Sequence, residues 1–132
     1  MTEQPNAVVF ALLDARRRHD LDAVAALLHP DVVHQGVTEE LVCNNRDEVL
    51  DNVRRSFHAD DHGVDHLELV AAGDTVIVGL SGPRFRDAPW ADRGNQLFIV
   101  HTVRDGRIVN MRDFLGRAEA FRAAGVEPVD WS

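Results

Sequence analysis

The chain of 132 residues has no tyrosine, no lysine and a single cysteine, Cys43. One cysteine cannot form an internal disulfide, so the sequence excludes a small fold held together by disulfides. Apolar runs such as residues 23–28 are far shorter than the roughly 20 residues that a membrane-spanning helix needs. The first six residues are polar and lack the features of a secretory signal. We therefore expect a cytoplasmic protein that does not enter a membrane.

Because lysine is absent, arginine supplies the basic side chains other than histidine, and the formal net charge is −8. Nucleic-acid-binding proteins usually gather their basic residues on one face, whereas the arginines here are dispersed. The one cluster, residues 16–18, falls near the end of a predicted helix, where positive charge suits the helix dipole. The sequence also has no glycine-rich phosphate loop. These absences predict no nucleic-acid partner and no cofactor.

Hydrophobic residues make up 45% of the chain and charged residues 27%, enough for a packed core and a solvated surface. The length fits one domain of ordinary size. No linker, repeat or low-complexity tract interrupts the sequence. The sequence therefore predicts a single domain over residues 6–125, followed by a short tail over residues 126–132.

Two helices are expected at the start of the chain. Apolar residues at three- and four-residue spacing predict a helix over residues 6–18, with Asn6 at its N-cap. Asp20 is expected to cap a second, shorter helix. Pro30 ends this helix, because the residue before a proline avoids helical backbone angles.

Two further helices follow from capping signals. Asn45 with Glu48 three residues later resembles a capping box and predicts a helix over residues 46–57. The last helix is expected over residues 117–124 and ends at Gly125, since glycine is favoured just after a helix.

The rest of the chain is rich in short strand patterns separated by turn signals. Asp105-Gly106 is a strong hairpin signal between the last two of them. The predicted strands cover residues 31–37, 41–43, 66–71, 75–85, 96–104 and 107–115.

Four consecutive strands with helices gathered at the two ends of the chain indicate an α+β domain. A curved antiparallel sheet wrapped around helices leaves a pocket on its concave side, and such pockets are the usual ligand sites. The partner that we expect for this pocket is a hydrophobic small molecule.

Two segments carry a resemblance to a known superfamily. ALLDARRRHDLDAVAALLHPDVVHQG, residues 11–36, resembles the two helices and strand that open SnoaL-like and nuclear transport factor 2-like (NTF2-like) proteins. VRDGRIVNMRDFLGRAEAFRAAG, residues 103–125, resembles their closing hairpin and helix. The resemblance implies a single cone-shaped domain of the NTF2-like, cystatin-like type. This fold hosts isomerases, hydrolases, cyclases, transport adaptors and plain binders.

Ketosteroid isomerases are one enzyme branch of this superfamily. The resemblance places their general-base aspartate at Gly36, or at His34 or Gln35 beside it. Their oxyanion-side acid falls near Ile99. Neither position holds a carboxylate in this sequence, which argues against that activity.

Limonene-epoxide hydrolases are a second branch, and their final aspartate lies in a W-R-D-Y-F-D run. The M-R-D-F-L-G run of this sequence matches it and places Asp113 at that aspartate. The tyrosine and asparagine of the hydrolases match His34 and Gly36, while their arginine and first aspartate fall near Leu80 and Gly82. The chain therefore resembles the hydrolase in one wall of the pocket and departs from it in the other.

Side chains on a strand alternate between faces, so the orientation of Asp113 implies that of its neighbours. If Asp113 points into the cone, Met111 and Val109 do so as well. The predicted site residues are Asp113 and His34 as catalytic groups, and His101, Arg84, Trp90, Met111 and Leu80 as substrate contacts.

A carboxylate in an apolar pocket holds its proton more tightly, and a neighbouring histidine can share it. Asp113 is therefore expected to accept a proton or activate water, with His34 orienting or sharing that proton. The structural alternative pairs Asp113 with Arg84 or Arg112 as a bridge. The corresponding alternatives are a hydrogen bond at a strand end for His34, and a satisfied core position for His101.

Three other groups of residues have simpler interpretations. His58, His62 and His66 recur every four residues, but Gly63 breaks the helix that zinc-type spacing would need. We predict a polar loop there and no metal site. Cys43 lies beside apolar residues and is expected to be buried and inert.

Aromatic and apolar residues at the surface suggest a second copy of the chain. Trp90 and Phe85 are expected either to form a lid over the pocket or to make a dimer contact. Phe98 and Val100 should lie on the outer sheet face, and an exposed apolar face favours a partner. The sequence therefore predicts a homodimer through the outer sheet face.

Two functions fit this pattern. The first is a cofactor-free isomerase, lyase or hydrolase that acts on a hydrophobic small molecule by acid–base chemistry. The alternative is a non-catalytic ligand-binding protein or a dimeric adaptor, and a pure adaptor would have a filled cone without a cavity.

Overall fold

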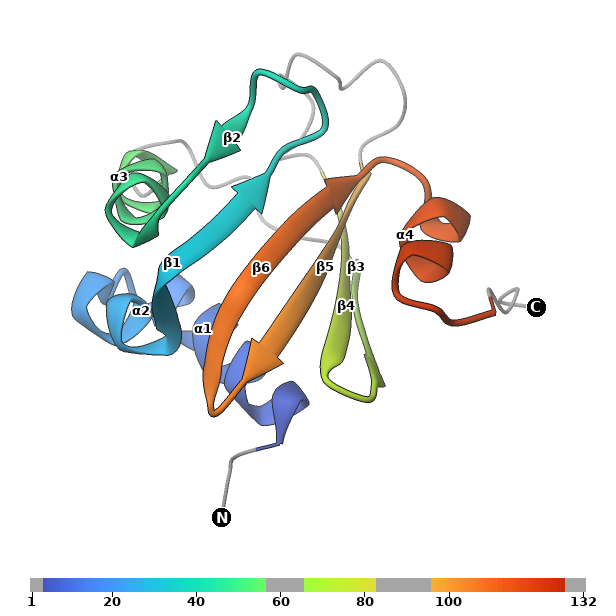
Figure 1. Ribbon diagram of the computed structural model, residues 1–132, viewed down its shortest axis with the longest axis horizontal. Helices are drawn as coiled ribbons and strands as arrows, with labels where there is room; N and C mark the ends of the chain where they lie inside the picture. Colours follow the sequence, from blue (N-terminus) through green and yellow to red (C-terminus); the bar gives the residue numbers. More distant parts are fainter. Residues whose placement is uncertain (1–3, 57–65, 83–95, 128–132) are drawn as a thin grey trace.

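The computed structural model describes residues 4–56, 66–82 and 96–127. A curved, open sheet of six strands separates two layers of helices (Figure 1). The helices are α1 (Pro5–Arg17), α2 (Leu21–Leu27), α3 (Arg46–Ser56) and α4 (Arg117–Ala123). The strands are β1 (Leu28–Gln35), β2 (Val42–Cys43), β3 (His66–Ala72), β4 (Thr75–Ser81), β5 (Gln96–Arg104) and β6 (Arg107–Phe114). The predicted α+β class is confirmed.

The strands follow the order β2-β1-β6-β5-β4-β3. Strands β3 to β6 form an antiparallel meander, as predicted. Strand β1 joins this meander by pairing in parallel with β6. As a result, the first and last strands of the chain lie side by side at the centre of the fold, and residues that are distant in sequence meet there.

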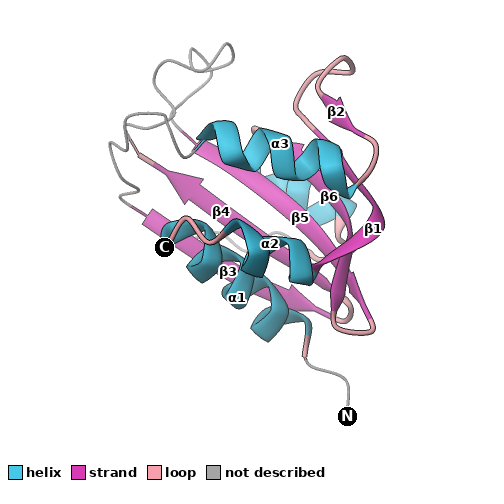
Figure 2. Cartoon of the chain, turned by 90° about the vertical axis from the view of Figure 1, so that its left-hand side faces the viewer, coloured by secondary structure: helices cyan, strands magenta, loops and turns pink. Residues whose placement is uncertain are grey.

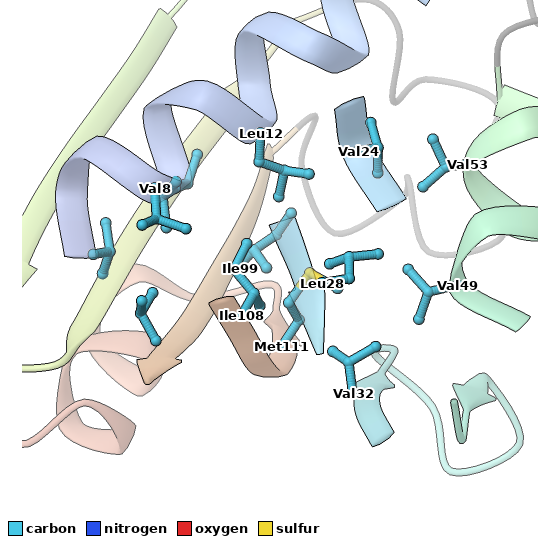
Figure 3. Close-up of a cluster of buried hydrophobic side chains, with 14 of the residues drawn as sticks. Val8, Leu12, Val24, Leu28, Val32, Val49, Val53, Ile99, Ile108 and Met111 are labelled. Carbon is cyan, nitrogen blue, oxygen red and sulfur yellow. The ribbon is translucent and has the colours of Figure 1, made fainter. Parts of the chain in front are cut away.

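The main core lies between the concave face of the sheet and helices α1, α2 and α3, which Figure 2 shows in front of the strands. Side chains from the three helices and from β1, β4, β5 and β6 converge there (Figure 3). Val8, Val24, Leu28 and Ile108 are completely buried. Burying each such side chain stabilises the fold by about 1.5–3 kcal/mol relative to exposing it.

The outer face of the sheet is covered by α4. Phe121 packs there with Ile77, Phe98 and Val100 in a second apolar cluster. The prediction placed Phe98 and Val100 on the outer face, and they do lie there. However, α4 already buries them within one chain, so they no longer argue for a partner. The homodimer itself stays a prediction.

The helix ends confirm most of the capping signals. The side chain of Asp20 accepts a hydrogen bond from the backbone N–H of Ala23 at 3.0 Å. Glu48 donates its backbone N–H to the Asn45 side chain at 2.9 Å, as in a capping box. The prediction for α1 was wrong, since its N-cap is Gln4 and not Asn6. Pro5 takes the first helical position, where its fixed backbone angle suits a helix start.

The bounds of β1 and β6 differ from the prediction. Strand β1 begins at Leu28, three residues before the predicted start, because its register with β6 shifts between Leu28 and Val33 and accommodates Pro30. In β6 the predicted inward orientation of Val109 is wrong. A second shift, between Thr102 and Val103 of β5, buries Ile108 instead.

Several predictions lie outside the described residues. They include the loop at residues 58–65, the whole loop at residues 86–95, and the end of the strand predicted to reach residue 85. Within the described ranges, no helix is both long and apolar enough to cross a membrane.

Candidate functional site

His34 on β1 and Asp113 on β6 form a close polar pair. His34 Nε2 lies 2.6 Å from Asp113 Oδ1. The side chains are 16% and 14% exposed, so the pair is neither deeply buried nor fully solvated. A carboxylate oxygen can only accept, so an ionised Asp113 requires His34 to donate its Nε2–H. The two residues predicted to be catalytic are thus in direct contact.

The parallel pairing of β1 with β6 creates this contact. His34 stands beside Met111 in the register, and Asp113 follows two residues later on the same face of β6. On the other side of β6, Asp113 is paired with Ile99 of β5. Both members of the pair therefore face the layer of α1, α2 and α3, with the apolar core beside them.

The end of β1 is held by the side chain of Gln35. Its Nε2 donates to the backbone oxygen of Thr38 at 2.8 Å, which ties down the loop between β1 and β2. Gly36 lies so close to Leu41 that an added Cβ would be 2.6 Å from the Cβ of Leu41. Only glycine fits this tight return. The loop therefore brings β2 back beside His34, with Cys43 directly opposite His34 in the register.

Cys43 is half-buried and its thiol is free. Burial is the largest cause that raises its pKa, and the nearby carboxylate of Glu48 adds to the effect. A raised pKa keeps the thiol protonated near neutral pH, and the thiol form is a poor nucleophile. The electrostatics agree with the expected inert role, although Cys43 is less buried than predicted.

His101 lies deeper in the cone, on the same face of the sheet as the pair. It is only 2% exposed, and its Nδ1 lies 3.3 Å from the backbone oxygen of Val76. Burial lowers the pKa of His101 to about 4. The imidazole is therefore neutral at neutral pH, and its geometry matches the structural alternative of a satisfied core histidine. Contact with a ligand stays a prediction for this residue.

The remaining predicted contacts divide into three groups. Met111 is buried in the main core, between His34 and His101 in the register. Leu80 is half-buried against the same core. Arg84 and Trp90 lie outside the described residues. The role of each in binding stays a prediction.

The bridge between Asp113 and Arg112, offered as the structural alternative, is absent from the described part of the chain. Arg112 is exposed, and its guanidinium lies 4.9 Å from the centre of the Phe114 ring. The two neighbours on β6 point to opposite faces, as strand alternation requires. Asp113 is consequently available to the histidine.

The sequence reasoning missed Gln35 as the residue that holds the loop beside the pair. A glutamine before a glycine is a weak signal, because its amide can bond to many backbone groups. The cross-strand position of Cys43 was also missed, since it depends on the turn. Across residues 4–56, 66–82 and 96–127, no group of three or more His, Cys, Asp or Glu side chains could hold a metal ion.

Comparisons with solved structures show the fold. An NTF2-like protein of Burkholderia thailandensis is 26% identical, with 90% of this chain and 98% of that chain covered at a TM-score of 0.63. An LEH-like epoxide hydrolase of M. tuberculosis is 23% identical, with 93% and 90% covered at a TM-score of 0.63. A candidate polyketide cyclase of Sinorhizobium meliloti is 24% identical, with 82% and 94% covered at a TM-score of 0.65.

No curated protein matched the chain. The model of the SnoaL-like domain matches residues 9–111. This match begins in α1 and ends at Met111, so it includes His34 and most of the sheet. The fold, the order of its strands and this match agree with the resemblance seen in the sequence, and the chain belongs to the SnoaL-like family.

Proposed function

We propose that this protein is a cofactor-free enzyme that uses His34 and Asp113 for acid–base chemistry on a hydrophobic small molecule. The observation that carries the proposal is the 2.6 Å contact between His34 Nε2 and Asp113 Oδ1 beside an apolar core. A proton can pass along such a contact without a large movement of either side chain. The reaction classes that fit are isomerisation, lyase chemistry and hydrolysis.

Asp113 is the proton acceptor in this proposal. Its carboxylate takes a proton from a carbon acid of the substrate, or from a water molecule that attacks the substrate. His34 holds the carboxylate in place through Nε2 and can share the proton. The apolar surroundings strengthen these electrostatic interactions, because little water competes for the two groups.

The family comparison supports the kind of ligand and leaves the reaction open. Among the similar structures are an LEH-like epoxide hydrolase and a candidate polyketide cyclase, as their descriptions state. Both descriptions name chemistry on small organic molecules. A pocket for a small molecule therefore fits this chain, and the His34–Asp113 pair supplies the acid–base groups.

A non-catalytic binding protein is the second candidate, and one observation favours it. The polar groups of the site bond to groups of the protein itself, His34 to Asp113 and His101 to the backbone of Val76. In a binding protein, polar groups that already have hydrogen-bond partners can line an apolar pocket without a cost in free energy. The two functions differ in whether the pair turns over a ligand that it contacts.

One experiment separates the two. The wild type, Asp113→Asn and His34→Gln are incubated with a panel of hydrophobic epoxides, unsaturated ketones and polyketide-like β-diketones. Binding is followed by thermal shift, and turnover by chromatography. If the protein is an enzyme, the wild type turns over one class of these compounds. The rate of turnover then falls by about 100-fold or more in both variants.

Asp47→Asn is the control, because Asp47 is an exposed carboxylate in the first turn of α3. It should turn over ligand like the wild type. Ligands that raise the melting temperature but are recovered unchanged would support the binder. Turnover that survives in both Asp113→Asn and His34→Gln would remove the pair from the mechanism.

A further inference from the structure

A hollow lies at the other end of β6 from Asp113. It has a volume of about 570 Å³ and is open to solvent on one side. Its walls come from the first residues of β1 and from the hairpin between β5 and β6. The lining residues are His29, Asp31, Arg104, Asp105, Arg107 and Val109.

Two irregularities of the sheet meet at this hollow. On one side, β1 pairs with β6 at Leu28–Ile108 and next at Val33–Asn110, so the four residues 29–32 face only Val109. On the other side, the β5–β6 register also shifts beside Val109. Val109 consequently has no partner in the register of either neighbouring strand. Bulges of this kind occur often beside binding sites, because they open a sheet and redirect side chains.

Charged side chains of both signs line the hollow. Arg104 and Arg107 are direct cross-strand partners, an arrangement in which like charges repel. Asp31 and Asp105 line the same hollow. Among the described residues, none of these four side chains forms an ion pair.

Other arginines of the chain behave differently. Arg17 and Arg18 pair with Asp14, and Arg117 pairs with Glu68. Ion pairs therefore form elsewhere among the described residues. Around the hollow, two positive and two negative groups form no such pair and remain available to a ligand.

His29 adds a donor of defined chemistry. The backbone N–H of Asp31 donates to its Nδ1 at 3.0 Å. A neutral imidazole that accepts at Nδ1 must carry its proton at Nε2. His29 therefore presents an N–H group, which suits an anionic oxygen.

We propose that this hollow binds a small zwitterion, with a carboxylate on Arg104 and Arg107 and an ammonium group on Asp31 or Asp105. Arginine forks bind carboxylates in pairs of parallel hydrogen bonds. A bound carboxylate also relieves the repulsion between the two arginines. The ammonium group of the ligand pairs with an aspartate of the hollow. A simple anion, by contrast, is repelled by both aspartates.

The test is an NMR titration of the full chain with three compounds that share a chain of three carbon atoms. β-Alanine carries both charges, propanoate only the negative one, and propylammonium only the positive one. The expected result is shifts of backbone signals around residues 29–31 and 104–109, with β-alanine binding roughly tenfold tighter than either single-charge compound. Equal affinity for β-alanine and propanoate would contradict the proposal that the hollow binds a zwitterion.

Three variants test the residues. Arg104→Gln and Arg107→Gln should each weaken β-alanine binding by roughly tenfold, which is the loss of one charged hydrogen-bond pair. Asp31→Asn should reduce the preference for β-alanine over propanoate. These side chains are exposed, so the fold should tolerate the changes.

Arg122→Gln is the matched control, since Arg122 is an exposed arginine of α4, away from the hollow. It should bind β-alanine like the wild type. The absence of any shift at tens of millimolar β-alanine, or an equal loss in Arg122→Gln and Arg104→Gln, would overturn the site. The experiment is independent of the His34–Asp113 pair, so each proposal can fail alone.

Discussion

Two polar pairs lie on opposite faces of the sheet, and they are built differently. On the outer face, Arg117 of α4 donates to Glu68 of β3 at 3.0 and 3.3 Å and stacks on Phe121 at 4.2 Å. On the inner face, His34 meets Asp113 by a single contact. The outer pair is fixed by two hydrogen bonds and an aromatic ring, which suits a structural role.

The inner pair has fewer constraints and joins a carboxylate to an imidazole, two groups that serve as general acids and bases. The outer pair contains an arginine, whose guanidinium can only donate hydrogen bonds. The same sheet therefore uses one face for a permanent attachment of α4, and offers on the other a pair that is suited to chemistry. Four predictions test this contrast.

The largest effect is expected from Phe121→Ala. Phe121 is buried against the outer face, and removing a buried phenylalanine ring costs about 3–5 kcal/mol of unfolding free energy. Urea denaturation followed by circular dichroism measures it. Phe10→Ala is the control, because Phe10 is 65% exposed on α1 and its loss should cost less than about 0.5 kcal/mol. Equal losses in both variants would contradict the role given to α4.

The pH dependence of stability comes next, and it tests the inner face. Burial lowers the pKa of His101 to about 4, from 6.5 when it is exposed. The unfolded chain therefore takes up the proton first as the pH falls. Stability due to His101 is complete above pH 6.5 and is lost as the pH falls to about 4, a loss of about 3 kcal/mol.

Denaturation curves between these two pH values measure this loss. His101→Leu removes the titrating group, so its stability should change less over the same range, even though the variant is less stable at neutral pH. A variant that keeps the slope of the wild type would show that another group causes the loss.

A smaller effect is expected from Glu68→Gln. The change removes the charge of the outer pair but keeps its size, and the pair is about one-fifth exposed. The expected cost is about 1–2 kcal/mol. Asp51→Asn breaks the exposed pair with Arg54 and should cost less than about 1 kcal/mol. A larger cost for Asp51→Asn than for Glu68→Gln would be inconsistent with the structural role of the outer pair.

The smallest effect on stability is expected from Asp113→Asn. Asparagine keeps the shape and can still accept from His34 Nε2–H, so the cost should stay below about 1 kcal/mol. Activity should fall far more under the proposed function. Loss of several kcal/mol would instead indicate that the pair on the inner face is structural, like the pair on the outer face.

The local signals of the sequence were sufficient for much of the fold. The Asp20 cap, the Asn45–Glu48 capping box and the Asp105-Gly106 hairpin act over a few residues and were predicted from sequence alone. The alternation of side chains also placed Asp113 on the same face as Met111. Each of these depends on backbone geometry that neighbouring residues determine.

Other features depended on contacts between distant segments. Val109 was predicted to face inward, but the register shift beside Thr102 and Val103 reverses the alternation at that point. Phe98 was expected to need an outside partner, but α4 covers it. A bulge or a docked helix leaves no local pattern, because its energy comes from packing against residues far along the chain.

The amino-acid sequence by itself determined the α+β class, the main helices and strands, and the shared face of Asp113 and Met111. Only the tertiary structure decided that His34 lies 2.6 Å from Asp113, since that contact requires β1 and β6 to pair in parallel with one particular register. It also decided that the charges around Val109 surround an open hollow. Local conformation follows from neighbouring residues, whereas a site is created where distant strands are brought into register by the packing of the whole core.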